Sequence, residues 1–121
     1  MGFSRARYDA VLERIAGAAK KSGRSPDEIQ LVSVSKTQPP EVVTEAIEGG
    51  VAILGENRVQ EAREKRSLIG PELAARVRWH LIGSLQRNKA RLVPGLFDAV
   101  ESIDSISLAK ELARRVESRG E

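Results

Sequence analysis

The sequence predicts an α/β fold in which parallel strands alternate with helices. Short apolar runs rich in β-branched residues recur along the chain, with starts near residues 31, 51, 78 and 99. Each run is followed by a segment whose apolar residues have helical spacing, and one more such segment precedes the first run. This regular alternation favours a parallel sheet with right-handed crossovers.

The N-terminal part predicts one helix followed by a strand. Residues 4–22 place apolar side chains on one stripe, at Tyr8, Val11, Leu12, Ile15, Ala18 and Ala19. Gly23 supplies a stop after this segment. Residues 30–35 are expected to form a buried strand, because Leu31, Val32 and Val34 run through it with little polar relief.

Proline and glycine mark the boundaries of the next unit. A helix opens at Pro39-Pro40 and closes at Gly49-Gly50, in the favoured order of proline first and glycine last. Residues 55–57 are expected to be a loop, and Asp104 or Ser105 can cap the last helix. For the remaining elements we expect strands at 51–54, 78–82 and 99–103, and helical segments at 59–68, 72–76, 86–93 and 106–116.

Two architectures accept this element order. One is a small open sheet complete in itself, and the other is half of a (β/α)₈ TIM-type barrel, which normally needs about 250 residues. An open doubly wound sheet usually carries a Gly-rich phosphate turn after its first strand, but here Lys36-Thr37-Gln38-Pro39-Pro40 follows instead. Counting strands leaves both possibilities open. We expect residues 1–121 to form a single domain.

Composition narrows the function classes. The net charge is +3, but the 20 basic and 17 acidic residues are interspersed, so the charge alone does not indicate nucleic acid. Aromatic residues make up 3% of the chain, which argues against base-stacking platforms. The chain has no cysteine, and no window approaches the ~18 apolar residues of a membrane span. We therefore expect a cytoplasmic protein without a nucleic-acid or membrane partner.

The loops after the four strands are the candidate site, because the carboxyl ends of parallel strands share one edge. Lys36 ends the first strand, with Val32 and Val34 on its own side of the pleat. An amine that emerges from an apolar wall is desolvated, which favours the neutral form that attacks carbonyl groups. The alternative is that Lys36 is an exposed loop charge, and its position alone does not decide between the two.

Asn57 and His80 also have two interpretations each. Asn57 can cap the following helix, with Gln60 at the third helical position, or contact a ligand at that helix N-terminus. His80 is the only histidine, and a lone histidine in a strand is more often a satisfied core residue than a base. No catalytic triad or metal-ligand spacing stands out. The basic cluster of Arg87, Asn88, Lys89 and Arg91 is interpreted as a solvated helix face, with phosphate or nucleic-acid contact as the minority option.

Four phrases of the sequence, in matching order and separation, resemble the pyridoxal 5′-phosphate (PLP) homeostasis proteins. The resemblance covers essentially the whole chain, and the phrases are Leu31-Val32-Ser33-Val34-Ser35-Lys36-Thr37, Gly55-Glu56-Asn57-Arg58-Val59-Gln60-Glu61, Arg78-Trp79-His80-Leu81-Ile82-Gly83-Ser84-Leu85-Gln86-Arg87-Asn88-Lys89 and Glu101-Ser102-Ile103-Asp104-Ser105.

This resemblance implies a fold like the N-terminal barrel of alanine racemase, with PLP held as a Schiff base on Lys36. It places Asn57 close to the cofactor, and His80 and Ser102 at strand ends from which the pyridine ring or its 3′-hydroxyl can be reached. The family has no established catalytic turnover and is thought to buffer or deliver PLP. An amino-acid racemase-like enzyme with the same barrel and cofactor is the alternative.

The chain departs from this family in length, because the relatives continue for about as many residues again. We therefore expect residues 1–121 to be a partial domain: an N-terminal helix and four strand-helix units, ending at 118–121 in the loop before a fifth strand. The phosphate cup of the barrel is expected near strands seven and eight. The expected partner is the C-terminal half or a second copy, and a third reading is a fragment that cannot bind PLP without its other half.

Overall fold

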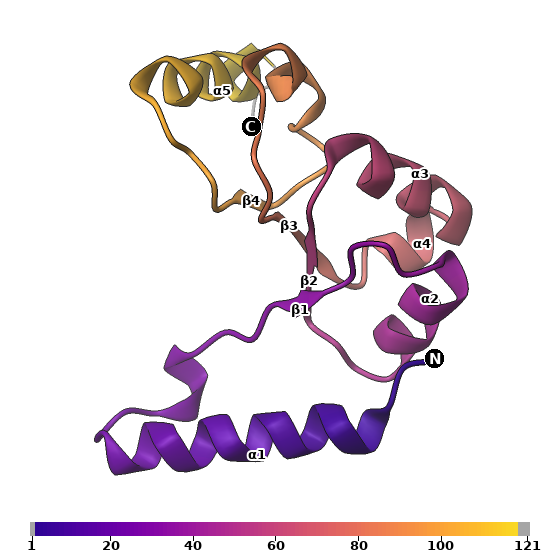
Figure 1. Ribbon diagram of the computed structural model, residues 1–121, viewed down its shortest axis with the longest axis vertical. Coiled ribbons are helices and arrows are strands. Elements are labelled where there is room, and N and C mark those ends of the chain that lie inside the picture. Colours follow the sequence, from indigo (N-terminus) through magenta and orange to yellow (C-terminus); the bar gives the residue numbers. More distant parts are fainter. Residues whose placement is uncertain (1, 119–121) are drawn as a thin grey trace.

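The computed structural model describes residues 2–118, and it confirms the alternation of strands and helices (Figure 1). Four parallel strands form one sheet in the order β1-β2-β3-β4. The strands are β1 (Ser33–Val34), β2 (Ile53–Glu56), β3 (Arg78–Leu81) and β4 (Ala99–Val100). The helical segments are α1 (Arg5–Lys21), η1 (Pro26–Glu28), α2 (Pro40–Glu48), α3 (Val59–Ile69), α4 (Pro71–Ala74), η2 (Arg87–Leu92) and α5 (Ile106–Ser118).

The strand order decides between the two architectures. Each strand pairs with the next one along the chain, so the described sheet has no point at which the order reverses. A doubly wound sheet has such a reversal, whereas a (β/α)₈ barrel adds its strands in sequence. The chain therefore has the progression of half a barrel. Figure 1 shows α2, α3 and α4 together on one side of the strands, with α1 and α5 at opposite ends of the molecule.

Strand register assigns the two faces of the sheet. Leu54 lies opposite Trp79, and both are fully buried in a cluster with side chains of α2 and α4. Gly55 lies opposite His80, and His80 lies opposite Ala99, which forms a neighbouring row across the sheet. Because side chains alternate along a strand, this second row faces away from the helices. In a barrel that face is the interior.

Two apolar clusters hold the helices against the sheet. The first joins α2 and α4 to the sheet through Val43, Ala46, Ile47, Val51, Leu54, Ala74, Val77 and Trp79. The second joins α3, η2 and α5 to β3 through Val59, Leu81, Leu85, Ala90, Val93 and Leu108. Trp79 also donates its indole N–H to the carbonyl oxygen of Ala74 at 3.0 Å, so this buried polar group is satisfied.

The first strand is shorter and more exposed than the sequence predicted. Residues 30–35 were expected to be a buried strand, but only Ser33 and Val34 are paired, and Val34 is 56% exposed. The physical reason is position: β1 is an edge of the described sheet and pairs only with β2. A strand is buried on both faces only where neighbouring elements cover it, and its own sequence cannot ensure that.

Three further expectations are corrected. Gly55 and Glu56 belong to β2 and are buried, although 55–57 was expected to be a loop. The segment expected as an α-helix at 86–93 is the 3₁₀ helix η2, closed by i→i+3 bonds such as Lys89 N–H to Gln86 O. The strand expected at 99–103 ends at Val100, and Ile103 is 42% exposed.

The helix boundaries agree better with the sequence. Pro40 opens α2, α1 ends at Lys21, and Ser105 caps α5 by accepting a hydrogen bond from Leu108 N–H at 3.1 Å. The apolar stripe of α1 is only partly covered, because Ala19 is its one buried residue among those described. The expected loop before a fifth strand lies largely outside the described residues. Within them, no helix has both the length and the apolar character needed to cross a membrane.

Candidate functional site

Lys36 lies in a tight turn directly after β1 and is exposed. The turn is closed by a hydrogen bond from Gln38 N–H to Ser35 O at 3.1 Å, which makes Lys36 and Thr37 its two central residues. Thr37 has a φ of 63°, the only positive value among the described residues other than glycine. The expected apolar wall is absent, since Val34 is largely exposed, so the reading of Lys36 as an exposed amine on a turn holds.

The turn stores backbone strain beside Lys36. A positive φ at the second central residue of a turn is normally supplied by glycine or asparagine. For a β-branched residue such as Thr37 the conformation is a true outlier, and strain of this kind is on the order of 1–3 kcal/mol. Surrounding contacts must therefore hold the turn in place.

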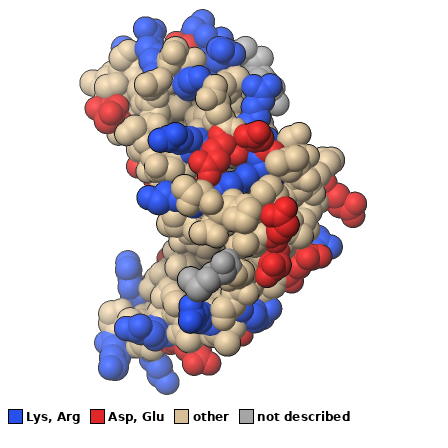
Figure 2. Space-filling view, turned by 45° about the vertical axis from the view of Figure 1, so that its right-hand side comes forward, with Lys and Arg blue, Asp and Glu red and all other residues tan. Residues whose placement is uncertain are grey.

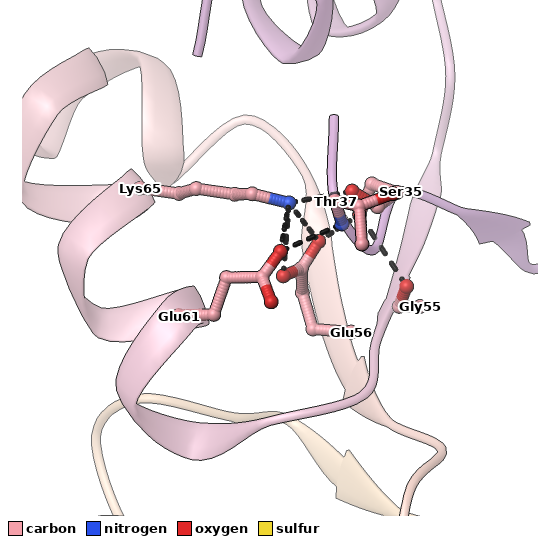
Figure 3. A network of polar contacts seen from close by, with 6 residues as sticks. All are labelled: Ser35, Thr37, Gly55, Glu56, Glu61 and Lys65. Carbon is pink, nitrogen blue, oxygen red and sulfur yellow. Dashed lines mark hydrogen bonds and ion pairs between the residues drawn. The ribbon is translucent and has the colours of Figure 1, made fainter. Parts of the chain in front are cut away.

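A buried polar network lies against this turn (Figure 3). At its centre is Lys65 of α3, whose ammonium donates to Ser35 O and to the carboxylate of Glu56 at 3.0 Å. The same ammonium forms an ion pair with Glu61 Oε1 at 3.2 Å. The Ser35 hydroxyl bonds to the same Glu56 carboxylate. Glu61 Oε1 in turn accepts the backbone N–H of Thr37 at 2.7 Å.

The network is charged, and its central pair, Lys65 and Glu56, is almost fully removed from water, whereas the Glu61 side chain is 28% exposed. The side chains of Lys65 and Glu56 are 6% and 0% exposed, so each charge depends on the other for compensation. An ammonium group has three N–H donors, and Lys65 uses them on Ser35 O and on the two oxygens of Glu56, while Glu61 lies within ion-pair distance. The hydrogen bond from Thr37 N–H lowers the pKa of Glu61, and Lys65 and Arg58 add to this while burial opposes it.

Sequence reasoning missed this network. Glu56 had been assigned to a loop, so a fully buried carboxylate at the end of β2 was not expected. One signal was available, because Glu61 and Lys65 are four residues apart, the spacing of ion pairs on a helix face. Nothing in the local sequence indicates that Lys65 reaches across to Ser35, thirty positions away.

Asn57 does not cap α3. The N-cap position is Arg58, which makes no side-chain capping bond, so the capping interpretation was wrong. Asn57 is half-buried directly after β2, and its oxygens lie so close to Gly83 that any side chain there would collide with them. The loops after β2 and β3 are thus packed against each other at Asn57.

His80 is buried but not satisfied. Its Nδ1 atom lies 3.3 Å from Glu101 Oε1, whereas Nε2 has no hydrogen-bond partner among the described residues. Buried polar atoms are rarely left unpaired, and an exception asks for an explanation. The interpretation of His80 as an ordinary satisfied core residue therefore fails for one of its two ring nitrogens.

Ser102 lies just beyond β4 and donates its hydroxyl hydrogen to Gly83 O at 2.5 Å. Gly83 thus contacts Asn57 on one side and Ser102 on the other, which joins the loops after three strands. The structure brings Asn57 and Ser102 together through Gly83 and places Lys36 after β1 at the same end of the strands. Within the described residues no hydrogen bond connects Lys36 to the other three.

Two grooves lie near these loops. One, of ≈ 280 Å³, is lined by Asn57–Gln60 and by Ser84, Leu85, Gln86 and Lys89. The other, of ≈ 400 Å³, lies between η2 and α5, where Arg114 and Arg115 bond to the buried carboxylate of Glu111 and lower its pKa. Arg87 lies 3.5 Å from the same carboxylate, so the basic cluster is partly an anchor for α5.

Figure 2 shows basic side chains gathered at the ends of the molecule that carry α5 and α1.

Comparison with known proteins finds relatives along most of the chain, although no family model matches it. The pyridoxal phosphate homeostasis protein of Escherichia coli K12 is 43% identical over 102 residues, which are 84% of this chain and 44% of that protein. The chain resembles half of a PLP homeostasis protein. The homeostasis protein of Aquifex aeolicus is 38% identical over 109 residues, or 90% of this chain and 46% of that protein.

Solved structures agree with this resemblance. PipY of Synechococcus elongatus PCC7942 with PLP bound has a TM-score of 0.71 and 39% identity, covering 91% of this chain and 50% of PipY. An unknown protein from Bifidobacterium adolescentis has a TM-score of 0.83 and 35% identity, and the match covers 99% of this chain and 54% of that protein. The chain thus spans about half the length of its relatives, and the predicted fold class and family resemblance are confirmed.

Proposed function

We propose that this chain binds PLP and takes part in intracellular PLP homeostasis, with the cofactor held as a Schiff base on Lys36. The observation that carries the proposal is the likeness to PipY with PLP bound, along 91% of the chain, together with an exposed lysine on a strained turn at a strand end. The proposal extends to a cytoplasmic location and to residues 1–121 acting as one partial domain.

Formation of a Schiff base requires from the protein an amine that is positioned to reach the aldehyde. The neutral amine of Lys36 attacks the aldehyde carbon, a carbon–nitrogen double bond forms, and the carbonyl oxygen leaves as water. When bound, PLP supplies the aldehyde and an electron-withdrawing ring. Lys36 is exposed and makes no hydrogen bond through its side chain within the described residues, so its amine is available for this reaction.

The other site residues fit a planar, polar ligand on the barrel side of the sheet. His80 offers a ring nitrogen that has no partner in the described part of the chain and can form a hydrogen bond with a substituent of the pyridine ring. Asn57 and Ser102 carry polar groups beside Gly83, where the absence of a side chain leaves the two loops close together. We propose ring contacts for these three residues and a phosphate cup supplied by another half or a second copy.

Absorbance with added PLP tests the proposal. The expected result is a Schiff-base band in the wild type that is lost in Lys36→Ala. Lys110→Ala removes another exposed lysine, on α5, and is expected to keep the band. A wild type without the band, or a Lys36→Ala variant with the same band, would overturn the proposal. Turnover of an amino acid would indicate the racemase-like alternative instead.

A further inference from the structure

The backbone on both sides of Lys36 is tied to one charged network. On one side, Ser35 O accepts from Lys65 and the Ser35 hydroxyl bonds to Glu56. On the other side, Thr37 N–H donates to Glu61 Oε1 at 2.7 Å. Figure 3 shows the contacts of Ser35 and Thr37. Lys36, which lies between them in the sequence, is exposed.

The bond from Thr37 to Glu61 opposes the strain in the turn. Thr37 has its positive φ at the peptide unit that donates this bond, and the acceptor is an ionised carboxylate. Hydrogen bonds to a charged acceptor are roughly twice as strong as neutral ones. Releasing the bond would let Thr37 return to an ordinary backbone conformation, and the direction of the Lys36 side chain would change with it.

Lys65 makes the arrangement rigid. It holds Glu61 at 3.2 Å and Glu56 at 3.0 Å, and both carboxylates reach the turn. These contacts therefore form a closed ring with the backbone of residues 35–37. The ring runs from Thr37 through Glu61, Lys65 and Glu56 back to Ser35. Since the N–H donors of Lys65 are used on acceptors, Lys65 serves as an anchor, whereas the side chain of Lys36 makes no hydrogen bond within the described residues.

We infer that Glu61 and Lys65 are positioning residues for Lys36: they lock the turn after β1 in the strained conformation that presents the Lys36 amine to an aldehyde. The inference rests on the proposed function, because the aldehyde is that of PLP. Neither residue is required to touch the cofactor.

The test compares Glu61→Ala with Glu61→Gln, which keeps an acceptor oxygen, and with Glu64→Ala, an exposed glutamate on the same helix. Hydrogen exchange of the Thr37 amide in the free protein reports the lock. Trapping with borohydride after mixing with PLP reports the rate of capture at Lys36. Thermal unfolding of each variant shows that it is folded.

We expect Glu61→Ala to speed Thr37 amide exchange at least about tenfold and to slow capture at Lys36 about tenfold, since a charged hydrogen bond is lost. Glu61→Gln should recover part of both effects, and Glu64→Ala should change neither. Capture of formaldehyde, which needs no oriented site, should be the same in all variants.

Two results would overturn the inference. If Thr37 exchange is unchanged in Glu61→Ala, the lock does not exist. If exchange rises while PLP capture stays at the wild-type rate, the lock exists but does not position Lys36. A wild type that captures no PLP defeats the proposed function itself, and the exchange result then shows separately whether the turn is locked.

Discussion

At the scale of single residues, the proposed site includes a strained stretch of backbone and a buried polar atom without a partner among the described residues. Thr37 adopts a conformation that suits glycine, directly beside Lys36, for which we propose the Schiff base. Among the described residues, the Nε2 atom of buried His80 has no hydrogen-bond partner. Strain and unpaired polar atoms are retained where surrounding structure enforces them, and both lie among the residues that the sequence resemblance connects with PLP.

The close contact between Gly83 and Asn57 predicts how a substitution at position 83 changes stability. A side chain at this position would collide with the oxygens of Asn57, so Gly83→Ala should destabilise the protein by about 1–3 kcal/mol, as overpacking does. Gly17→Ala is the matched control, because position 17 lies within α1 with no neighbouring atom near its added methyl group. It should stabilise by up to ~1 kcal/mol. Urea unfolding measures both, and equal effects would contradict the close contact.

The lowered pKa values of Glu61 and Glu111 predict how the free energy of unfolding changes with pH. The pKa of Glu61 is lowered mainly by the hydrogen bond that it accepts from Thr37 N–H. The pKa of Glu111 is lowered by hydrogen bonds from Arg114 and, second, from Arg115. A lowered pKa in the folded state means a contribution that is complete above the unfolded pKa of about 4.3 and is lost as pH falls through the folded value. Stability should therefore drop below about pH 4.3, and Glu61→Gln/Glu111→Gln should flatten the drop. An unchanged pH profile in the double variant would contradict this.

At the scale of elements, local patterns predicted the existence of helices and strands but not their extent. Pro40 and Ser105 mark helix starts through their own chemistry, and the structure agrees at both. The length of β1 depends on which strands lie beside it, and the burial of Glu56 depends on Lys65 reaching it from α3. Such pairings belong to the fold and leave no signal in a short window of sequence.

The same argument applies to the site. Lys36 is predicted as a site residue because it ends an apolar run, which is a local feature, and this assignment stays a prediction. The capping role of Asn57 was expected from its place before a helix, but α3 begins one residue later than that role requires. Whether Asn57, His80 and Ser102 contact PLP stays a prediction.

The buried pair of Lys65 and Glu56 gives the sharpest prediction at this scale. Lys65→Met leaves a fully buried carboxylate without its counter-charge, which costs about 3–5 kcal/mol. Changing Glu56 as well, in Lys65→Met/Glu56→Gln, removes the uncompensated charge and should recover part of the loss. Urea unfolding of both variants measures the difference. A double variant no more stable than the single one would contradict the pairing.

At the scale of the whole molecule, β1 and β4 are the two edges of the described sheet. Beside β4 lies an apolar groove of ≈ 520 Å³, whose lining includes Phe97, Val100, Ile103 and Leu112. Proteins normally cover exposed edges and apolar patches. This agrees with the proposal that another half or a second copy completes the barrel.

Self-association tests that proposal for the chain alone. If a second copy covers the groove, native mass spectrometry should detect a dimer, and Ile103→Glu should weaken it at least about tenfold by burying a charge. Ile106→Glu is the control, since Ile106 is 76% exposed and does not line the groove. A monomer at all concentrations would exclude the second copy and leave the other half as the partner.

The most direct test of the central claim is the position of the covalent bond. After PLP addition and borohydride reduction, a protease that cuts after glutamate releases residues 29–41, a peptide whose single lysine is Lys36. We predict that mass spectrometry finds the pyridoxyl group on this peptide and that Lys36→Ala loses it. A label spread over other lysines, with residues 29–41 unmodified, would contradict the account.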